Sequence, residues 1–253
     1  FSPLNNFYYI PGEPLTMDID LKGYQEYPAK VTGNDCFSSH PSNTDWYETI
    51  KLNYGVFYQG GGEKQFFPIP STWKKMADIL LFWASKKIDG VRVDMAEMVP
   101  VEFFQWAIDK VKKKYPKFIF IGECYDPSRY DAYLKAGFDY LYDKVGMYDY
   151  LRGVTSKGWP AEGITAKWMQ HGDERIKHML YFLPCIFPGN KPCFFRGLPF
   201  LLGVFDAVQR KSHISHTDIQ PATGQLNNFV LPDVLSVNFH NLTHELRIYR
   251  DCF

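Results

Sequence analysis

Between residues 70 and 142 the chain alternates helix-type and strand-type hydrophobic patterns. From Trp73 to Ala84 apolar side chains recur every three or four residues, which predicts a helix that Ser71 would cap and that Lys86 and Lys87 would close. A short stretch of β-branched residues, 91–94, follows an Asp-Gly pair and predicts a strand. The last residue of that strand, Asp94, carries a carboxylate.

The same order of elements repeats twice. Pro100 opens a second helix that ends in three lysines, and the continuous apolar run 118–121 predicts a strand buried on both faces. A third helix over 127–135 and a third strand over 138–142 complete the series. Strands separated by helices at this spacing imply right-handed parallel crossovers. We therefore predict an α/β fold, either an open doubly wound sheet or a (β/α)8 barrel.

The two ends of the chain do not share this pattern. Residues 1–49 are rich in Pro, Gly, Asn and Ser interleaved with aromatic residues, which predicts an irregular segment whose rings pack on the scaffold, line a binding surface, or both. From 184 to 253 no hydrophobic period is sustained, although 198–208 and 242–249 are candidates for short helices. We expect three parts: 1–49, the alternating segment 50–183, and a tail of uncertain structure, 184–253.

Composition narrows the classes of function. Lys plus Arg and Asp plus Glu each number 28, so the net charge is zero, which argues against a nucleic-acid binder and a polybasic membrane binder. No uncharged apolar run is long enough for a transmembrane helix. Aromatic residues make up 17% of the chain, and their faces suit both core packing and stacking on ring ligands.

The cysteines show no zinc-type spacing, so we expect free thiols. A disulfide between Cys185 and Cys193 stays open as an alternative. His213 and His216 lack a third metal ligand in a recognisable frame.

Two carboxylates end consecutive predicted strands, Asp94 in the first and Glu123 just after the second. In a parallel sheet both would lie at the edge where chemistry occurs. Two carboxylates in one cleft suit glycoside hydrolysis, with one as ionised nucleophile and the other as proton donor. Arg92 would point to the same side as Asp94 and keep it ionised. The alternative is that Arg92 and Asp94 form a buried ion pair and that Glu123 caps a helix.

These residues resemble the α-amylase superfamily of glycoside hydrolases. The segment Asp89-Gly90-Val91-Arg92-Val93-Asp94 is similar to the family's fourth-strand block, and Phe120-Ile121-Gly122-Glu123 is similar to its fifth-strand block, which ends in the acid/base glutamate. Leu52-Asn53 and Phe82-Trp83 are similar to two further positions of the family. Four blocks in the family's order make the resemblance specific over about residues 1 to 183.

The resemblance implies a partial (β/α)8 barrel, about strands four to six, and a retaining mechanism on α-glucosidic bonds of starch-like or maltooligosaccharide substrates. Asp94 would be the nucleophile, Glu123 the acid/base and Arg92 the residue that orients Asp94. A retaining pair of carboxylates lies roughly 5–5.5 Å apart. Glu97 and Met98 occupy positions that often contact the departing part of the substrate, where many starch-cleaving members have a Lys-His pair.

Two family blocks are missing from the sequence. The third-strand block precedes the inserted second domain in the family, and the chain begins at Phe1 within what resembles that domain, so residues 1–49 would be part of it. Met179–Leu183 is similar to the approach to the seventh-strand block, but Asn-His-Asp occurs nowhere in the chain. We therefore expect an N-terminally truncated chain whose tail is out of register with the family through a frameshift, a deletion or a misassembled gene, and which has little or no turnover alone.

Three functions remain open on these residues: a hydrolase, a transglycosylase in which a sugar hydroxyl replaces water, and a non-catalytic glucan-binding remnant. The partner in each is an α-glucan oligosaccharide or polysaccharide. The resemblance implies no cofactor for the chemistry and is compatible with a structural calcium ion. Asn34, Asp35 and Asp45 offer oxygen atoms, but no ligand loop of diagnostic spacing assigns them to a metal.

Overall fold

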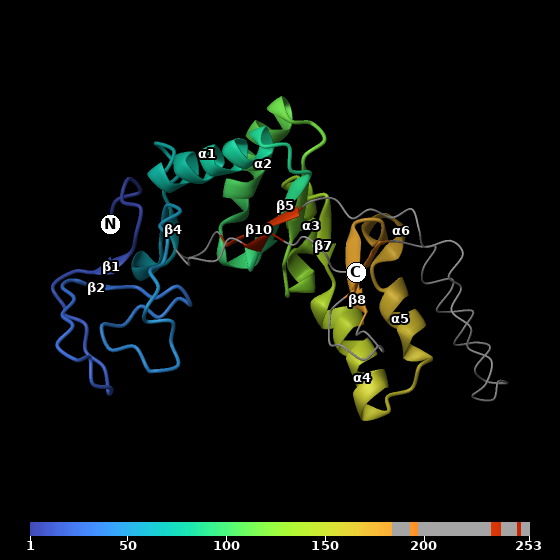
Figure 1. Cartoon of the computed structure of the whole chain (residues 1–253), viewed down its shortest axis with the longest axis horizontal. Coiled ribbons are helices and arrows are strands. Elements are labelled where there is room, and N and C mark those ends of the chain that lie inside the picture. Colours follow the sequence, from blue (N-terminus) through green and yellow to red (C-terminus); the bar gives the residue numbers. More distant parts are fainter. Residues whose placement is uncertain (184–192, 197–233, 239–246, 249–253) are drawn as a thin grey trace.

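The structure is a computed structural model that describes residues 1–183, 193–196, 234–238 and 247–248 (Figure 1). Its strands are β1 (Tyr9–Ile10), β2 (Ala29–Lys30), β3 (Val56–Phe57), β4 (Glu63–Lys64), β5 (Gly90–Asp94), β6 (Ile119–Gly122), β7 (Tyr140–Tyr142), β8 (Met179–Leu183), β9 (Cys193–Arg196), β10 (Val234–Asn238) and β11 (Arg247–Ile248). Its α-helices are α1 (Ser71–Ser85), α2 (Val101–Lys114), α3 (Tyr130–Lys135), α4 (Asp149–Lys157), α5 (Gly163–Met169) and α6 (Gly172–Ile176). Among these described residues, no helix has the length and apolar character needed to cross a bilayer.

A sheet with a parallel centre organises the molecule. Its strand order is β11-β10-β5-β6-β7-β8-β9, in which β10, β5, β6, β7 and β8 run parallel and the two outermost pairs are antiparallel. The three strands predicted from the sequence are β5, β6 and β7, and they are neighbours in chain order. The predicted α/β class and its parallel crossovers are therefore confirmed.

Helices α1 and α2 cover the strands because each carries an apolar stripe of helical spacing. Trp73 and Leu80 of α1 and Phe103 of α2 are buried in the same core as the strand residues. The rings of Trp73 and Phe103 meet edge to face with their centroids 5.7 Å apart. Trp73 Nε1 also donates to the backbone oxygen of Tyr54 at 3.0 Å, which ties α1 to the segment before it.

Strand β6 is not buried on both faces as its apolar sequence predicts. Phe120 is 1% exposed, whereas Ile119 and Ile121 are only half-buried. Successive side chains of a strand point to opposite faces of the sheet. The face that carries Phe120 is covered by helices, while the face that carries the two isoleucines is only partly covered by the described residues.

The helix boundaries differ from the predicted ones in two places. The N-cap of α1 is Pro70, and Ser71 is the first helical residue and makes no capping hydrogen bond through its side chain. A proline cannot donate a backbone hydrogen bond, so it fits the boundary where the amide has no helical partner. The predicted helix 127–135 divides into a 3-10 turn, Pro127–Arg129, and α3, because the Asp126 side chain caps the turn through the amide of Ser128.

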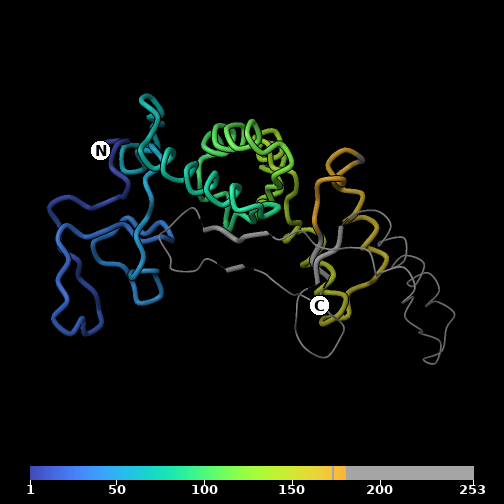
Figure 2. Tube along the Cα trace, turned by 45° about the horizontal axis from the view of Figure 1, so that its top comes forward, coloured from blue at the N-terminus to red at the C-terminus, as the bar shows by residue number. Residues whose placement is uncertain are grey.

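The N-terminal segment forms a small unit at the far end of the molecule from α4, α5 and α6 (Figures 1 and 2). Strand β1 pairs antiparallel with β2, and β3 with β4, with two residues in each strand. A separate cluster of buried residues lies beneath β1 and β2: Tyr8, Ile10, Ala29 and Val31. A bridge between Phe7 and Leu52 attaches the segment to the chain that leads into α1.

Three described pieces of the tail join the sheet. Strand β9 pairs antiparallel with β8, β10 pairs parallel with β5, and β11 pairs antiparallel with β10. The predicted helix 242–249 is therefore wrong at 247–248, where the backbone hydrogen-bonds as a strand. The predicted helix 198–208 lies outside the described residues, as do Cys185, His213 and His216.

Candidate active site

The two carboxylates predicted from the sequence come together at one edge of the parallel strands. Strand β5 ends at Asp94, Glu123 follows β6, and the register pairs Val93 with Gly122, so both carboxylates sit at the same level. Nη1 of Arg92 donates to Asp94 Oδ1, and Nη2 donates to Glu123 Oε1 at 2.8 Å. The side chains of Asp94 and Glu123 are 30% and 12% exposed, so solvent reaches both. One planar cation thus holds two accessible carboxylates together.

The ion pair that the alternative interpretation requires is present, but it is shared. Arg92 binds both carboxylates and lies 5.7 Å from the ring centroid of Tyr142, a buried residue of β7. Burial opposes the charge of Arg92, but Glu123 and Asp94 outweigh it and raise the pKa of the guanidinium. Arg92 is therefore a fixed positive charge at this edge of the sheet.

Glu123 does not cap a helix; its carboxylate lies among donors from two loops. Oε1 accepts from the Tyr125 hydroxyl at 2.8 Å as well as from Arg92, and Oε2 accepts from the backbone amide of Met95 at 3.0 Å. Burial raises the pKa of Glu123, and neighbouring Asp94 raises it further, while Arg92 and the other donors lower it. The net direction is upward, which favours a carboxyl group that can carry a proton.

The turn after β5 presents the amide of Met95 to Glu123. Met95 has φ 44° and ψ 48°, a left-handed conformation that non-glycine residues seldom adopt. The backbone then continues with Ala96, whose amide donates to the Glu123 carbonyl at 2.8 Å, while the Glu123 amide donates to the Val93 carbonyl at 3.0 Å. The loops after β5 and β6 are thereby hydrogen-bonded to each other on both sides of Glu123.

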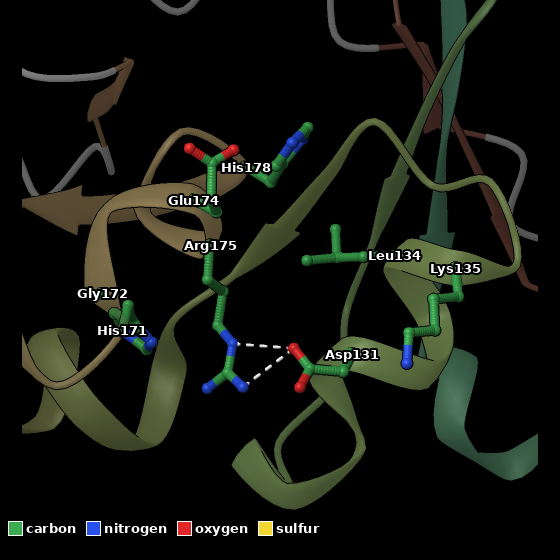
Figure 3. A pocket seen from close by; sticks show the side chains of 8 residues that line it. All are labelled: Asp131, Leu134, Lys135, His171, Gly172, Glu174, Arg175 and His178. Carbon is green, nitrogen blue, oxygen red and sulfur yellow. Dashed lines mark hydrogen bonds and ion pairs between the residues drawn. The ribbon is translucent and has the colours of Figure 1, made fainter.

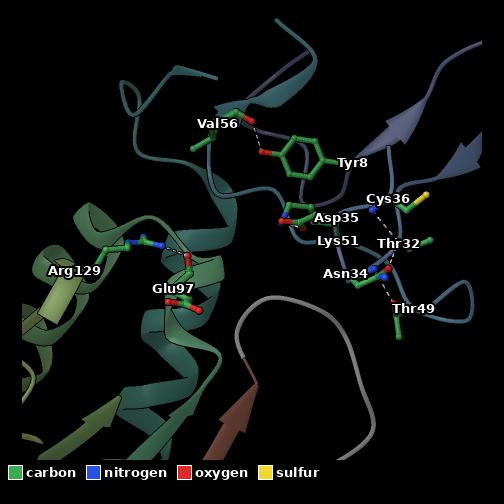
Figure 4. A network of polar contacts seen from close by, with 11 residues as sticks. Tyr8, Thr32, Asn34, Asp35, Cys36, Thr49, Lys51, Val56, Glu97 and Arg129 are labelled. Carbon is green, nitrogen blue, oxygen red and sulfur yellow. Dashed lines mark hydrogen bonds and ion pairs between the residues drawn. The ribbon is translucent and has the colours of Figure 1, made fainter. Parts of the chain in front are cut away.

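Glu97 and Met98 lie in the 3-10 turn that follows Met95. Glu97 Oε2 accepts from the amides of Tyr125 and Asp126, each at 3.1 Å, so this oxygen faces the loop after β6. Figure 4 shows Arg129 directed at the backbone carbonyl of Glu97, to which it donates at 3.0 Å. Met98 is half-buried. Contact of either side chain with a substrate stays a prediction.

Sequence reasoning did not identify Tyr125, Tyr142 or Asp143. Tyr125 contacts Glu123, and Tyr142 contacts Arg92. Asp143 comes directly after β7, as Glu123 comes directly after β6. Asp143 is fully buried and pairs through Oδ2 with Nε2 of buried His171 at 2.6 Å. All three are polar or aromatic residues at a strand end or within three positions of one, and that placement is the signal by which the sequence could have identified them.

A hollow of about 520 Å³ lies elsewhere, between α3 and α6 (Figure 3). It is lined by Asp131, Leu134, Lys135, His171, Gly172, Glu174, Arg175 and His178. Two of its charged residues pair with each other: Arg175 donates to Asp131 through Nε at 3.0 Å, and its Nη2 lies 2.8 Å from the same carboxylate. None of the predicted site residues lines it, so its size does not make it the better candidate for the reaction centre.

The three oxygen donors considered for calcium bind protein groups instead. Asp35 pairs with the buried ammonium group of Lys51 (Figure 4). Asn34 Nδ2 donates to Asp45 Oδ1 at 2.9 Å, and Ser42 donates to Asp45 Oδ2. A cation at Asp35 would face the positive charge of Lys51, so Asp35 does not fit a calcium ion. Within the described ranges, no group of three or more His, Cys, Asp or Glu is placed to hold a metal.

The sequence is similar to two curated proteins that carry the same name. The chain is 34% identical over 142 residues to an alpha-1,4-glucan:maltose-1-phosphate maltosyltransferase of Rhodospirillum rubrum, which covers 52% of this chain and 19% of the relative. It is 29% identical over 132 residues to the enzyme of the same name from Cereibacter sphaeroides, covering 47% of this chain and 22% of the relative. The chain thus spans about a fifth of the length of these relatives.

The chain was also compared with solved structures and with models of protein families. The structure is similar to an α-amylase from Lactobacillus plantarum, with 26% sequence identity, a TM-score of 0.33 and coverage of 39% of this chain and 25% of the other. No family model matches the sequence.

Proposed function

Because this chain belongs to the α-amylase superfamily of glycoside hydrolases, we propose that Asp94, Glu123 and Arg92 form the reaction centre of an enzyme that acts on α-glucosidic bonds. The observation that carries the proposal is the guanidinium of Arg92 between two carboxylates that end adjacent parallel strands. A double displacement needs one carboxylate to attack and another to carry a proton, and the raised pKa of Glu123 suits the second role.

The reaction proceeds in two steps. Asp94 attacks the anomeric carbon, the glycosidic carbon–oxygen bond breaks, and the proton of Glu123 goes to the departing oxygen. An acceptor hydroxyl then attacks the anomeric carbon, its proton goes to Glu123, and the bond to Asp94 breaks. Two inversions give net retention. Arg92 keeps Asp94 oriented and balances the charge that passes between the carboxylates.

We favour a sugar hydroxyl over water as the acceptor. Both relatives described above are named as maltosyltransferases that act with an α-1,4-glucan, and the first step is the same for transfer and hydrolysis. The substrates proposed are α-1,4-glucan chains or maltooligosaccharides, with a maltosyl phosphate as a donor to be tested. Hydrolysis is the second candidate, since water can attack the same glycosyl-enzyme.

We also infer that residues 50–183 form part of a (β/α)8 barrel, with β5, β6 and β7 as its strands four to six, and that residues 1–49 are part of a domain inserted before them. Parallel neighbouring strands joined by helices support the first inference. The separate buried cluster beneath β1 and β2 supports the second. Glu97 and Met98 would then contact the departing part of the substrate.

Covalent trapping of the nucleophile tests the proposal on the full-length product of the gene. A fluorinated α-glucosyl fluoride that forms a long-lived glycosyl-enzyme should label the peptide that contains Asp94, as read by mass spectrometry of a digest. Fluoride leaves without a proton donor, so the result does not depend on Glu123. Asp94→Asn should not be labelled, while Asp109→Asn, in an exposed ion pair of α2, should be labelled as the wild type is.

The outcomes separate the candidate functions. Label on another residue, or equal label on Asp94→Asn, would remove Asp94 from its role as nucleophile. Absence of label with retained glucan binding would support the non-catalytic remnant.

A second experiment identifies the acceptor. The full-length product of the gene is given maltooligosaccharides in water, and the lengths of the products are followed by chromatography. Longer chains are expected from transfer; glucose and shortened chains alone would make the enzyme a hydrolase.

A further inference from the structure

Tyr125 and Glu97 lie in the loops around the proposed acid/base, Glu123. The sequence did not single out Tyr125, and it predicted Glu97 only as a contact with the substrate. On the basis of the proposed function, we propose that Tyr125 is a positioning residue that, with Arg92, occupies Oε1 of Glu123, so that the transferred proton is carried by Oε2, and that Glu97 holds Tyr125 in place. The proposal stands on hydrogen-bond geometry in the loops after β5 and β6.

The two carboxylate oxygens of Glu123 have different hydrogen-bond partners. Oε1 accepts from Arg92 Nη2 and from the Tyr125 hydroxyl, both at 2.8 Å. A carboxylate oxygen has two lone-pair directions, so these two donors fill Oε1. Oε2 accepts from the amide of Met95 at 3.0 Å, which leaves it a second direction. A proton on Oε1 would meet the fixed positive charge of Arg92, so Oε2 is the oxygen that carries it.

Hydrogen bonds to Glu97 hold the backbone at Tyr125. Tyr125 as a whole is 38% exposed, so packing alone does not hold it. Its backbone amide donates to Glu97 Oε2 at 3.1 Å, and the same oxygen also accepts from the Asp126 amide and from the Cys124 thiol at 3.4 Å. One carboxylate oxygen therefore gathers three consecutive donors of the turn that presents Tyr125 to Glu123.

The charged and titratable groups around Glu123 come from three elements. Arg92 and Asp94 belong to β5, and Tyr125 belongs to the loop after β6. From beyond β7, the ammonium group of Lys144 lies 5.6 Å from the ring centroid of Tyr125. Burial, the bond to Glu123 and its charge raise the pKa of the Tyr125 hydroxyl well above its usual range, so it stays a donor.

The sign of one pKa change tests the assignment. If Tyr125 donates to Oε1, it stabilises the ionised form of Glu123, and Tyr125→Phe should raise the pKa of Glu123. If the proton instead sits on Oε1 and is donated to Tyr125, the hydroxyl stabilises the acid form, and the same variant should lower that pKa. A tyrosine that only fills space should leave it unchanged.

The measurement is a ¹³C NMR titration of the chain labelled at the glutamate carboxyl carbons, with the Glu123 signal assigned from its absence in Glu123→Gln. Tyr125→Phe is expected to raise the pKa of Glu123. Tyr24→Phe is the matched control, because Tyr24 also donates to a carboxylate, Glu26 Oε2 at 2.8 Å, in the N-terminal segment. It should leave the Glu123 signal unchanged.

Glu97 is tested by a pair of variants that remove the same charge. Glu97→Gln keeps an oxygen acceptor for the Tyr125 amide, whereas Glu97→Ala does not, so the pKa of Glu123 should be higher in Glu97→Ala. Equal values in the two variants would remove Glu97 from the proposal, and a lowered or unchanged pKa in Tyr125→Phe would overturn it.

The fluoride trapping described above keeps this inference separate from the proposed function. Labelled Asp94 with an unchanged titration in Tyr125→Phe would leave the function standing and reject the role of Tyr125. Unlabelled Asp94 with the expected rise in the pKa of Glu123 would confirm the hydrogen-bond arrangement and reject the enzyme.

Discussion

Replacing Glu123 with glutamine is expected to slow turnover of α-1,4-linked maltooligosaccharides by roughly 10²–10⁴-fold, the usual contribution of general acid–base catalysis. Glutamine keeps the size of the side chain and an oxygen that can accept from Arg92 and Tyr125, but it has no proton to give to the departing sugar. The variant isolates the proton transfer from the positioning of the site. Initial rates of the full-length gene product, wild type and variant, measure the effect.

The dependence on leaving group identifies the step that is lost. With an α-glucosyl fluoride, which departs without protonation, the formation of the glycosyl-enzyme should be far less affected than with a maltooligosaccharide. The alkaline limb of the pH–rate profile, which reports the deprotonation of Glu123, should disappear in the variant. Glu174→Gln, an exposed carboxylate paired with Lys177, should behave as the wild type does. A loss smaller than tenfold in Glu123→Gln would remove Glu123 from the acid/base role.

The second large effect is on stability. Replacing Asp143 with alanine should lower the free energy of unfolding by about 3–5 kcal/mol, the usual cost of breaking a buried pair. The Asp143 side chain is fully buried and accepts from His171 at 2.6 Å and from the amides of Gly146 and Met147 at 2.9 and 3.1 Å. The variant removes the acceptor for all three donors while they remain in the interior.

Urea denaturation followed by tryptophan fluorescence measures this change. Asp109→Ala is the control, because its partner Lys113 is 74% exposed and such a surface pair contributes about 0.5 kcal/mol or less. A free energy of unfolding for Asp143→Ala within about 1 kcal/mol of the wild-type value would contradict this prediction. It would mean that the hydrogen bonds of Asp143 do not stabilise the loop after β7.

The strands and the pair of carboxylates could be predicted from the sequence because their signals are local. The β-branched stretch that ends at Asp94 and the apolar run before Glu123 both lie next to turn residues, and the helix between them has an unbroken apolar stripe. Arg92 follows from the two-residue period of a strand. These features need no knowledge of the rest of the chain, and the structure brings all three side chains together.

The remaining features depend on contacts that a pattern does not contain. Met95 adopts a left-handed conformation against its own preference, because the turn between β5 and the next 3-10 helix requires it. The pairing of Asp143 with His171 depends on α4 and α5 packing against the turn that follows β7, and α5 begins at Gly163 with no capping side chain to indicate its start. The half-burial of Ile121 reflects which face of the sheet is covered, and an all-apolar run cannot show that.

Every group of the proposed centre, from Arg92 to Tyr125, comes from a single strand–helix–strand unit. A parallel pair needs a crossover of a dozen or more residues, so these contacts are close to the most local that a parallel sheet allows. Contacts of low sequence separation cost little chain entropy and form early in folding. We therefore expect the contacts of the centre to be among the first of the sheet to form when the chain folds.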